Sequence, residues 1–331
     1  MDDTAGWSRP ISETAIEVRG LIKEYDGFRA VDGLDLSVAK GEIFGLLGPN
    51  GAGKTTTIEC IVGLRRPTSG TVRVLGMDPM QDRRAITSRV AVQPQSASVF
   101  EQLTVAETLT LFASFHSRAR PVRDVIATVG LKDSTAVRAT RLSGGQLRRL
   151  HLGVALIGDP ELLVLDEPSA GLDPSARQSL WRVIRELRDD GRTVLLSTHL
   201  MDEAAALCDR VAIVTHGRIA QLGTPDELIR RFSATSELSF TVDRETDPID
   251  LAELLGLTPI RTLVCGERLE VHVQTADPDD LIRRLTFRAG IRARDYHVKR
   301  TSLEEVFLEV SGTDPTSDES GERHSRRRPP P

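Results

Sequence analysis

One octapeptide decides how this chain folds: Gly48-Pro49-Asn50-Gly51-Ala52-Gly53-Lys54-Thr55, or GPNGAGKT. It matches the phosphate-loop pattern G-x-x-x-x-G-K-[ST] at every position. The apolar run Ile43–Leu47 before it is typical of a strand buried on both faces, and Lys54–Ile58 opens a helix behind it. Glycines let successive backbone N–H groups turn inward around phosphate oxygens, and the helix N-terminus adds its dipole. The segment therefore predicts a binding site for the phosphates of a nucleoside triphosphate.

Two side chains of this loop have specific expected roles. Lys54 is expected to reach the β- and γ-phosphates, and the Thr55 hydroxyl is expected to ligate Mg²⁺. A plain glycine turn with an incidental lysine is the alternative, and the flanking strand and helix disfavour it. A dinucleotide fingerprint is also disfavoured, because G-x-G-x-x-G does not occur in this loop and Lys54 would have no role. The residues expected to contact the nucleotide here are Gly48, Pro49, Asn50, Gly51, Ala52, Gly53, Lys54, Thr55 and Thr56.

A second glycine-rich segment, Leu142–Gln146 (LSGGQ), precedes a helix expected over Leu147–Ile157. A Ser-Gly-Gly corner at a helix N-terminus can bind an anion. The same residues can also be an ordinary helix cap, because serine is favoured and glycine is tolerated at that position. The residues alone leave both interpretations open.

A pair of carboxylates, Asp166 and Glu167, follows the apolar run Leu162–Leu165. At the carboxyl end of a buried strand they would project into the crevice where α/β sheets bind ligands. Asp166 suits the coordination shell of Mg²⁺, and Glu167 suits the activation of a water molecule. The alternative is a solvated acidic strand end.

Apolar strands alternate with amphipathic helices along most of the chain. Further strands are expected at Ile16–Arg19, Leu34–Val38, Arg89–Val92 and Thr193–Ser197, and helices are expected within Leu103–Gly158 and over Gln178–Asp190. Fully apolar strands that alternate with helices indicate a mostly parallel sheet with helices on both faces. We therefore expect an α/β fold of the P-loop NTPase type.

A composition shift at Phe232–Ser236 marks the start of a second, smaller domain. The expected order there is strand, helix, strand, strand, helix, strand, which is the ferredoxin-like α+β order. These elements are Leu238–Val242, Pro248–Leu255, Ile260–Val264, Arg268–Val273, Asp279–Phe287 and Ile291–Val298, with a hairpin turn at Cys265–Glu267 and a last amphipathic segment at Leu303–Val310. The expected organisation is a disordered start (1–13), a nucleotide-binding domain (14–232) with a helical subdomain (about 96–158), an accessory domain (236–312) and a disordered tail (313–331).

Composition excludes several classes of protein. The 331 residues carry a net charge of −5, which gives no global reason to expect nucleic acid. We expect no membrane-spanning helix and no secretory signal, because no uncharged apolar run is long enough and the acidic start leads into no apolar stretch. The three widely spaced cysteines, Cys60, Cys208 and Cys265, fit neither a disulfide scaffold nor a cysteine-rich zinc site.

The phosphate loop, Leu142–Gln146 and the pair Asp166-Glu167 together resemble, in order and spacing, the motifs of ATP-binding-cassette (ABC) ATPases. The resemblance covers about residues 14–230, and Leu142–Gln146 equals the family signature letter for letter. Within that family the chain resembles the nucleotide-binding subunits of daunorubicin-resistance-type drug exporters, because Ser302–Leu308 is similar to the ending common in that subgroup. The resemblance implies ATP hydrolysis coupled to transport.

The resemblance also assigns roles to residues that the pattern alone would not single out. It implies that Tyr25 stacks on adenine, although a plain strand tyrosine is the alternative. It implies that Gln95 senses Mg²⁺ and the attacking water; Gln93 is a nearby rival, and Gln95 has the better spacing. It implies that His199, which follows an apolar strand, contacts the γ-phosphate.

The resemblance further implies that the signature of one subunit covers the ATP held by the other, so that a homodimer completes both sites. The residues concerned are Ser143, Gly144, Gly145 and Gln146, together with Asp173 in a loop that crosses to the opposite subunit. The expected partner is a separate integral membrane permease, which would dock near Ser96–Leu111 at the cytoplasmic face of a bacterial membrane. The C-terminal domain is then a dimer-stabilising appendage or a ligand sensor.

Three other functions remain as alternatives. A soluble ABC ATPase could act on the ribosome or on DNA, but ribosomal members usually carry two cassettes and repair members a long coiled-coil insertion, and neither occurs here. A regulatory nucleotide-binding module would need no catalytic carboxylate, yet Glu167 is present. An importer has the same ATPase motifs, and only the C-terminal resemblance favours export of a drug, antibiotic or other amphiphile.

Overall fold

The protein is described from a computed structural model, which defines residues 14–96, 98–232, 236–243, 260–265, 268–287, 292–299 and 302–312. The chain divides into two compact units, Met1–Pro225 and Asp226–Pro331. This division lies before the composition shift at Phe232–Ser236, because helix α8 (Pro225–Phe232) groups with the second unit. Within the ranges given, no helix is both long and apolar enough to cross a membrane.

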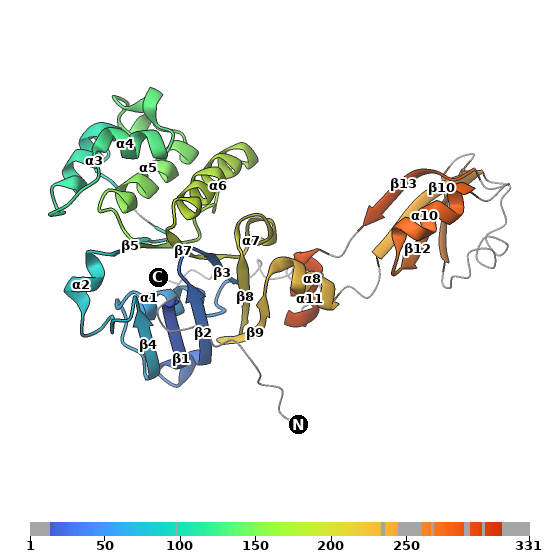
Figure 1. Ribbon diagram of the computed structural model, residues 1–331, viewed down its shortest axis with the longest axis horizontal. Helices are drawn as coiled ribbons and strands as arrows, with labels where there is room; N and C mark the ends of the chain where they lie inside the picture. The colour runs from blue at the N-terminus through green and yellow to red at the C-terminus, as the bar shows by residue number, and fades with distance from the viewer. Residues whose placement is uncertain are drawn as a thin grey trace, which may run out of the picture. The chain divides into compact units, whose positions relative to one another are not determined.

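A six-stranded sheet forms the centre of the first unit (Figure 1). Its strand order is β5-β6-β7-β3-β8-β9, with five parallel strands and an antiparallel edge strand β9. The strands are β3 (Ile43–Leu47), β5 (Val90–Gln93), β6 (Leu162–Asp166), β7 (Thr193–Thr198), β8 (Arg210–Thr215) and β9 (Arg218–Gly223). Every residue of β3, β6 and β7 is buried, which is why these strands read as continuous apolar runs. The expected mostly parallel α/β fold is confirmed.

The first unit also contains a separate antiparallel sheet. Its buried side chains share one hydrophobic core with those of the central sheet. Its order is β2-β1-β4, with β1 at Thr14–Tyr25, β2 at Phe28–Ala39 and β4 at Ser69–Val74. Strands β1 and β2 are longer than the sequence predicted, because register shifts interrupt the alternation of apolar and polar residues along them. The hairpin between them places Tyr25 and Phe28 opposite each other at its tip.

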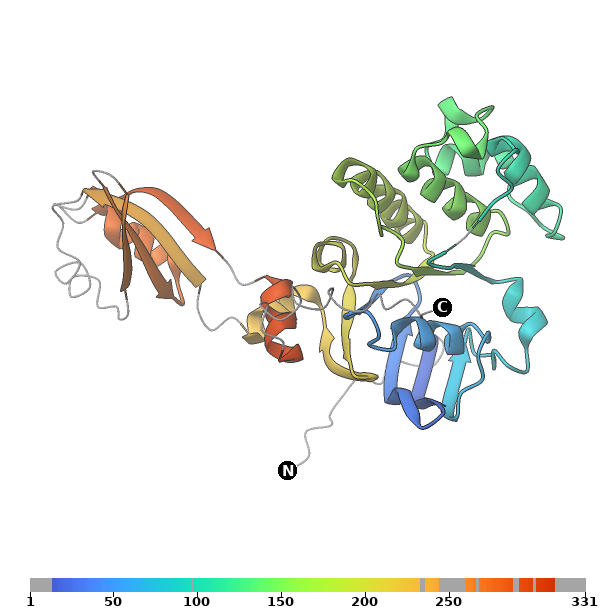
Figure 2. The same ribbon diagram turned by 180° about the vertical axis from the view of Figure 1, so that it is seen from behind.

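Helices of the first unit lie around the central sheet. They are α1 (Lys54–Ile61), α2 (Arg83–Thr87), α3 (Val105–Ala113), α4 (Val122–Thr128), α5 (Gly144–Leu156), α6 (Pro174–Asp189) and α7 (Met201–Leu207), with single 3₁₀ turns at Lys132–Ser134 and Ala139–Arg141. Helices α3, α4 and α5 pack on one another and lie on the side of the central sheet opposite to β1, β2 and β4 (Figures 1 and 2).

Two helices begin earlier than the sequence predicted. Helix α5 begins at Gly144 and not at Leu147, because Ser143 and Gln146 form a capping box that satisfies the first-turn backbone. Helix α6 begins at Pro174, because Asp173 caps its N-terminus and proline is tolerated in a first turn. Both helices are longer than predicted for the same reason: a capping side chain satisfies backbone N–H groups of the first turn, so the helix begins before its apolar pattern does.

The second unit contains a four-stranded antiparallel sheet in the order β11-β12-β10-β13. Its elements are β10 (Ser236–Asp243), β11 (Ile260–Cys265), β12 (Arg268–Thr275), α10 (Pro278–Phe287), β13 (Arg294–Lys299) and α11 (Leu303–Ser311). Phe240, Val271 and Leu281 are among the buried residues of its core. The strand order is the ferredoxin-like one. The expected helix Pro248–Leu255, two residues of the expected hairpin turn, and both expected disordered ends lie outside the described residues.

Candidate nucleotide-binding site

The phosphate loop joins β3 to α1, and at two of its positions neighbouring backbone leaves no room for a side chain. Gly53 precedes α1 with a φ of 100°, and a Cβ atom there would lie 2.3 Å from the carbonyl oxygen of Ala30. A Cβ atom on Gly48 would lie 2.3 Å from the carbonyl oxygen of Val214. Space therefore requires glycine at both positions, and at Gly53 the backbone torsion requires it as well.

The side chain of Lys54 binds back to the phosphate loop. It is 5% exposed, and Nζ donates hydrogen bonds to the carbonyl oxygens of Gly48 at 2.7 Å and Pro49 at 3.1 Å. The same Nζ lies 3.4 Å from Oε1 of Glu167. The ammonium group thus links the phosphate loop to the carboxylate that follows β6.

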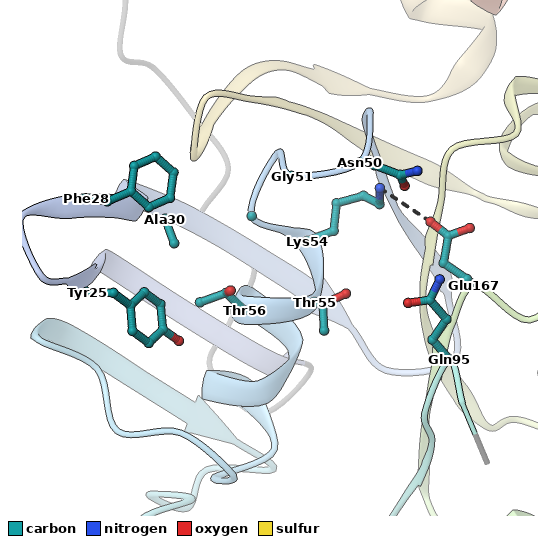
Figure 3. A pocket seen from close by; sticks show the side chains of 11 residues that line it. Tyr25, Phe28, Ala30, Asn50, Gly51, Lys54, Thr55, Thr56, Gln95 and Glu167 are labelled. Carbon is teal, nitrogen blue, oxygen red and sulfur yellow. Dashed lines mark ion pairs between the residues drawn. The ribbon is translucent and has the colours of Figure 1, made fainter. Parts of the chain in front are cut away.

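A cavity of about 470 Å³ opens beside this loop (Figure 3). That volume lies within the usual range for small-molecule sites, roughly 300–1,000 Å³. In Figure 3, Tyr25 and Phe28 lie at one end, and Gln95 and Glu167 lie at the other, beyond Lys54. An aromatic end and a charged end suit a base and a polyphosphate. The lining residues are Tyr25, Phe28, Ala30, Asn50, Gly51, Gly53, Lys54, Thr55, Thr56, Gln95 and Glu167.

Asp166 ends strand β6 and is 4% exposed. The hydroxyl of Thr55 donates to its Oδ2 at 3.1 Å, and Ser197 at the end of β7 donates to its Oδ1. Parallel strands bring these residues together because their carboxyl ends lie on one edge of the sheet. The hydroxyl of Thr55 and the carboxylate of Asp166 therefore lie next to each other beside the phosphate loop.

Glu167 has both carboxylate oxygens partnered. Oε1 faces Lys54, and Oε2 lies 2.5 Å from Nδ1 of His199. The Glu167 side chain is 5% exposed, whereas that of His199 is 42% exposed. Glu167 also has a φ of 51°, a left-handed conformation that is uncommon for a non-glycine residue. Its N–H donates to the carbonyl oxygen and the hydroxyl of Ser197, both at 3.1 Å, which holds the residue in that conformation.

The two candidate glutamines occupy different environments. Gln95 lines the cavity, whereas Gln93 lies within β5, is 2% exposed and has no hydrogen-bond partner for its amide among the described residues. The position of Gln95 is therefore the one from which a side chain can face a nucleotide.

The signature residues do not line this cavity. Ser143 accepts a hydrogen bond from the N–H of Gln146 at 3.2 Å, and the Gln146 side chain accepts one from the N–H of Ser143 at 2.9 Å. Gly144 and Gly145 form the first turn of α5, and a Cβ on Gly145 would lie 2.7 Å from Cβ of Ala176. Within one chain these residues therefore act as a helix cap and a close helix contact. The interpretation as a helix cap, which the sequence left open, is realised in this chain.

Asp173 is also outside the cavity. Its carboxylate accepts a hydrogen bond from the N–H of Ala176 at 2.9 Å and caps α6. Ser143 and Asp173 are both exposed. Their side chains thus have structural partners within the chain and remain on its surface.

Three residues at the site, Phe28, Ala30 and Ser197, were not predicted from the sequence. Phe28 is 65% exposed at the hairpin tip and lines the cavity. Ser197 is fully buried and holds both Asp166 and Glu167. A serine ending an apolar strand two residues before His199 was the available signal for Ser197, whereas Phe28 carried none beyond its nearness to Tyr25.

A buried acid lies behind the site. Glu203 on α7 is fully buried, and burial raises the pKa of its carboxyl group. Ser169 donates to its Oε1, and Trp181 Nε1 donates to the same oxygen at 3.1 Å. This network joins α6 and α7 to the segment that follows Glu167.

The fold and the cavity define a P-loop nucleotide-binding domain. A family model described as ABC transporter matches residues 31–170. Among solved structures, an ATP-binding subunit of an ABC transporter is similar, with a TM-score of 0.59 and 30% sequence identity over 66% of this chain and 93% of that chain.

Two relatives match almost the whole chain. The daunorubicin/doxorubicin resistance ATP-binding protein DrrA of Streptomyces peucetius is 38% identical over 335 residues, covering 93% of this chain and 95% of that protein. The Nod factor export ATP-binding protein I of Rhizobium sp. (strain N33) is 38% identical over 307 residues, covering 91% and 98%. The chain therefore belongs to the ABC transporter family, as an ATP-binding subunit with ATPase activity, and the resemblance read from its motifs is confirmed.

Proposed function

We propose that this chain hydrolyses ATP to drive the export of a small amphiphile, such as a drug or antibiotic, through a separate membrane permease. The observation that carries the ATPase chemistry is the position of Glu167, held between Lys54 and His199 at the edge of the phosphate-loop cavity. The direction and the kind of substrate are supported by the relatives, which are named for daunorubicin/doxorubicin resistance and for Nod factor export.

In the proposed reaction, Glu167 accepts a proton from water as the water oxygen bonds to the γ-phosphorus. The bond from that phosphorus to the bridging oxygen breaks, and ADP leaves with the electron pair. Lys54 and the loop N–H groups hold the phosphates, so the protein supplies position and charge and no covalent nucleophile. His199 fixes the carboxylate through Oε2, which leaves Oε1 to face the water once Lys54 turns to phosphate.

We infer that Thr55, Asp166 and Gln95 hold Mg²⁺. The hydroxyl of Thr55 already meets the Asp166 carboxylate at 3.1 Å, and Gln95 lines the same cavity. Hydroxyl, carboxylate and amide oxygens are the ligands that Mg²⁺ prefers, so the residues present fit the ion. When bound, Mg²⁺ neutralises charge on the phosphate oxygens.

The remaining site residues are proposed to act across a homodimer. Ser143, Gly144, Gly145, Gln146 and Asp173 lie outside the cavity of their own chain, which supports a role at the ATP held by a second copy. Tyr25 is proposed to stack on adenine, since it lines the aromatic end of the cavity. Residues 14–232 would form the ATP-binding domain, and residues 236–312 an accessory domain.

The permease is proposed to dock at Ser96–Leu111, which would place the chain at the cytoplasmic face of the membrane. Phe100 in this segment is 61% exposed, and helix α3 begins only at Val105. A soluble ABC ATPase of the ribosome or DNA is the alternative function, and a net charge of −5 gives no global reason to expect binding to nucleic acid.

Co-purification tests the proposal. Tagged Glu167→Gln protein is purified from its host in mild detergent with ATP, with Lys54→Ala, which is expected to bind ATP weakly, as the matched control. We expect a stoichiometric multi-span membrane protein. Recovery of only ribosomal proteins or DNA would leave the ATPase chemistry intact and contradict the transporter assignment.

A further inference from the structure

The guanidinium group of Arg148 bridges two loops that reach the nucleotide cavity. Arg148 lies on α5, and it donates from Nη1 to the carbonyl oxygen of Gln95 at 3.2 Å and from Nη2 to that of Glu167 at 3.4 Å. Gln95 and Glu167 both line the cavity, on separate strand ends. One side chain from the signature helix therefore contacts both.

We propose that Arg148 is a positioning residue that fixes the backbones of Gln95 and Glu167 to the helix carrying the signature. The proposal rests on the proposed function, in which Gln95 and Glu167 face the γ-phosphate and the attacking water. It adds a residue that touches neither nucleotide nor water and acts through the two main chains.

The conformation of Glu167 explains why such a tie is needed. A left-handed φ of 51° at a non-glycine residue is strained and persists only where neighbouring groups hold it. Ser197 holds the N–H of Glu167, and Arg148 together with the N–H of Ala170, at 3.2 Å, holds its carbonyl oxygen. Both ends of the residue are thus fixed, and its side chain is aimed by that backbone.

The charge of Arg148 suits this task. Its side chain is half-buried, and burial lowers its pKa from the ordinary value, an effect that the nearby carboxylates of Glu203 and Glu167 only partly offset. A planar guanidinium offers donors on two separate nitrogens in a fixed fork, so it can reach carbonyl oxygens on two different loops, whereas an ammonium group donates from a single nitrogen.

Helix α5 carries both Arg148, with its two hydrogen bonds, and the signature residues. Arg148 lies five residues after Ser143, which is about 7.5 Å along an α-helix. A helix of this length is stiff, so a movement of Ser143 would be passed to the carbonyl oxygens of Gln95 and Glu167. Binding of a second copy at the signature is thereby linked mechanically to the alignment of the Glu167 carboxylate.

Three variants of the full chain test the proposal. Arg148→Ala removes the bridge, and Arg148→Lys keeps the charge but not the fork. Arg149→Ala is the matched control, because Arg149 is the neighbouring arginine and also donates to two carbonyl oxygens, those of Val129 and Gly130, away from the cavity. The measurements are kcat, the Kd of a fluorescent ATP analogue with displacement by ATP, and the thermal unfolding midpoint.

We expect Arg148→Ala to lower kcat at least ~10-fold while Kd changes less than ~3-fold, since the lost bonds align catalytic groups and do not bind the nucleotide. Arg148→Lys should give an intermediate kcat, and Arg149→Ala should keep kcat within about twofold of the parent. If Arg148→Ala does not fold, the Arg148→Lys result decides alone.

The proposal is overturned if Arg148→Ala or Arg148→Lys keeps the parent kcat, or if Arg149→Ala loses as much kcat as Arg148→Ala. It is also overturned if kcat and nucleotide affinity fall together, which is the sign of general damage. Glu167→Gln is assayed alongside. A parent enzyme that hydrolyses ATP and an inactive Glu167→Gln uphold the proposed ATPase chemistry, on which this proposal rests, whatever Arg148 does, so the two failures are distinguishable.

Discussion

Nδ1 of His199 lies 2.5 Å from Oε2 of Glu167, while Nζ of Lys54 lies 3.4 Å from the other oxygen of the same carboxylate. Lys54 therefore has two competing partners, because the phosphates that it is proposed to bind carry negative charge as well. In the proposed reaction, ATP draws Lys54 away, which frees Oε1 to accept the proton of water while His199 still holds Oε2. The proposed mechanism thus couples the arrival of substrate to the exposure of the base.

The first prediction concerns that base. Glu167→Gln should retain ATP affinity and lose hydrolysis by about 10²-fold or more, because an amide accepts no proton from water. Phosphate release under saturating ATP and equilibrium binding of ATP measure the two effects. A variant that hydrolyses ATP within a few-fold of the parent would show that Glu167 is not the general base.

The second prediction concerns Lys54. Lys54→Ala should weaken ATP binding by about 10-fold or more, because it removes a charge-assisted contact with the phosphates and leaves Glu167 buried without its cation. Equilibrium binding of ATP measures the effect. Lys40→Ala is the control, since Lys40 is an exposed lysine outside the cavity, and equal losses in both variants would contradict the role of Lys54.

Much of this fold was predictable because its signals are local. The apolar run Ile43–Leu47 and the loop after it predicted β3 and α1, and strands β6 and β7 were found for the same reason. Strand β4 carried no such signal, since four of its six residues are exposed and only Val72 and Val74 are buried. A sheet edge in contact with solvent has no apolar pattern to read.

The site was predictable where a motif contains its own geometry, where carboxylates follow a buried strand, and where the family resemblance assigns the residue. Lys54 and Thr55 are positioned by the loop to which they belong. Phe28 lines the cavity from β2, and Ser197 on β7 holds Asp166 and Glu167, so both roles depend on how strands pair, which residue spacing does not contain. The predicted starts of α5 and α6 were wrong by a few residues, because capping by Ser143 and Asp173 lengthens each helix beyond its apolar pattern.

The third prediction uses the buried acid Glu203. Its folded pKa is raised above the ordinary value of 4.5 by burial, so its contribution to stability is complete below that value and is lost as the pH rises through the folded pKa. Glu203→Gln cannot ionise and should therefore gain stability relative to the parent as the pH rises, seen as an increase of a few degrees in its Tm relative to that of the parent.

Thermal unfolding of both proteins at pH 5 and pH 8 tests this, and the change between the two pH values cancels any constant cost of the amide. Glu186→Gln is the control, because Glu186 is exposed on α6. A Tm difference between Glu203→Gln and the parent that stays the same at both pH values would refute the assignment.

The last prediction compares two glycines of the phosphate loop. Gly51 and Gly53 both have positive φ, 82° and 100°, but a Cβ on Gly51 would meet no atom within 4 Å, whereas one on Gly53 would meet the Ala30 carbonyl oxygen at 2.3 Å. Gly51→Ala should therefore cost only the torsional strain, about 1 kcal/mol in the free energy of unfolding. Gly53→Ala must also displace β2 backbone, so it should cost about 3 kcal/mol or more and weaken ATP binding. Denaturant titration of both variants ranks them, and equal costs would mean that torsion alone, and not the approach to Ala30, demands glycine at residue 53.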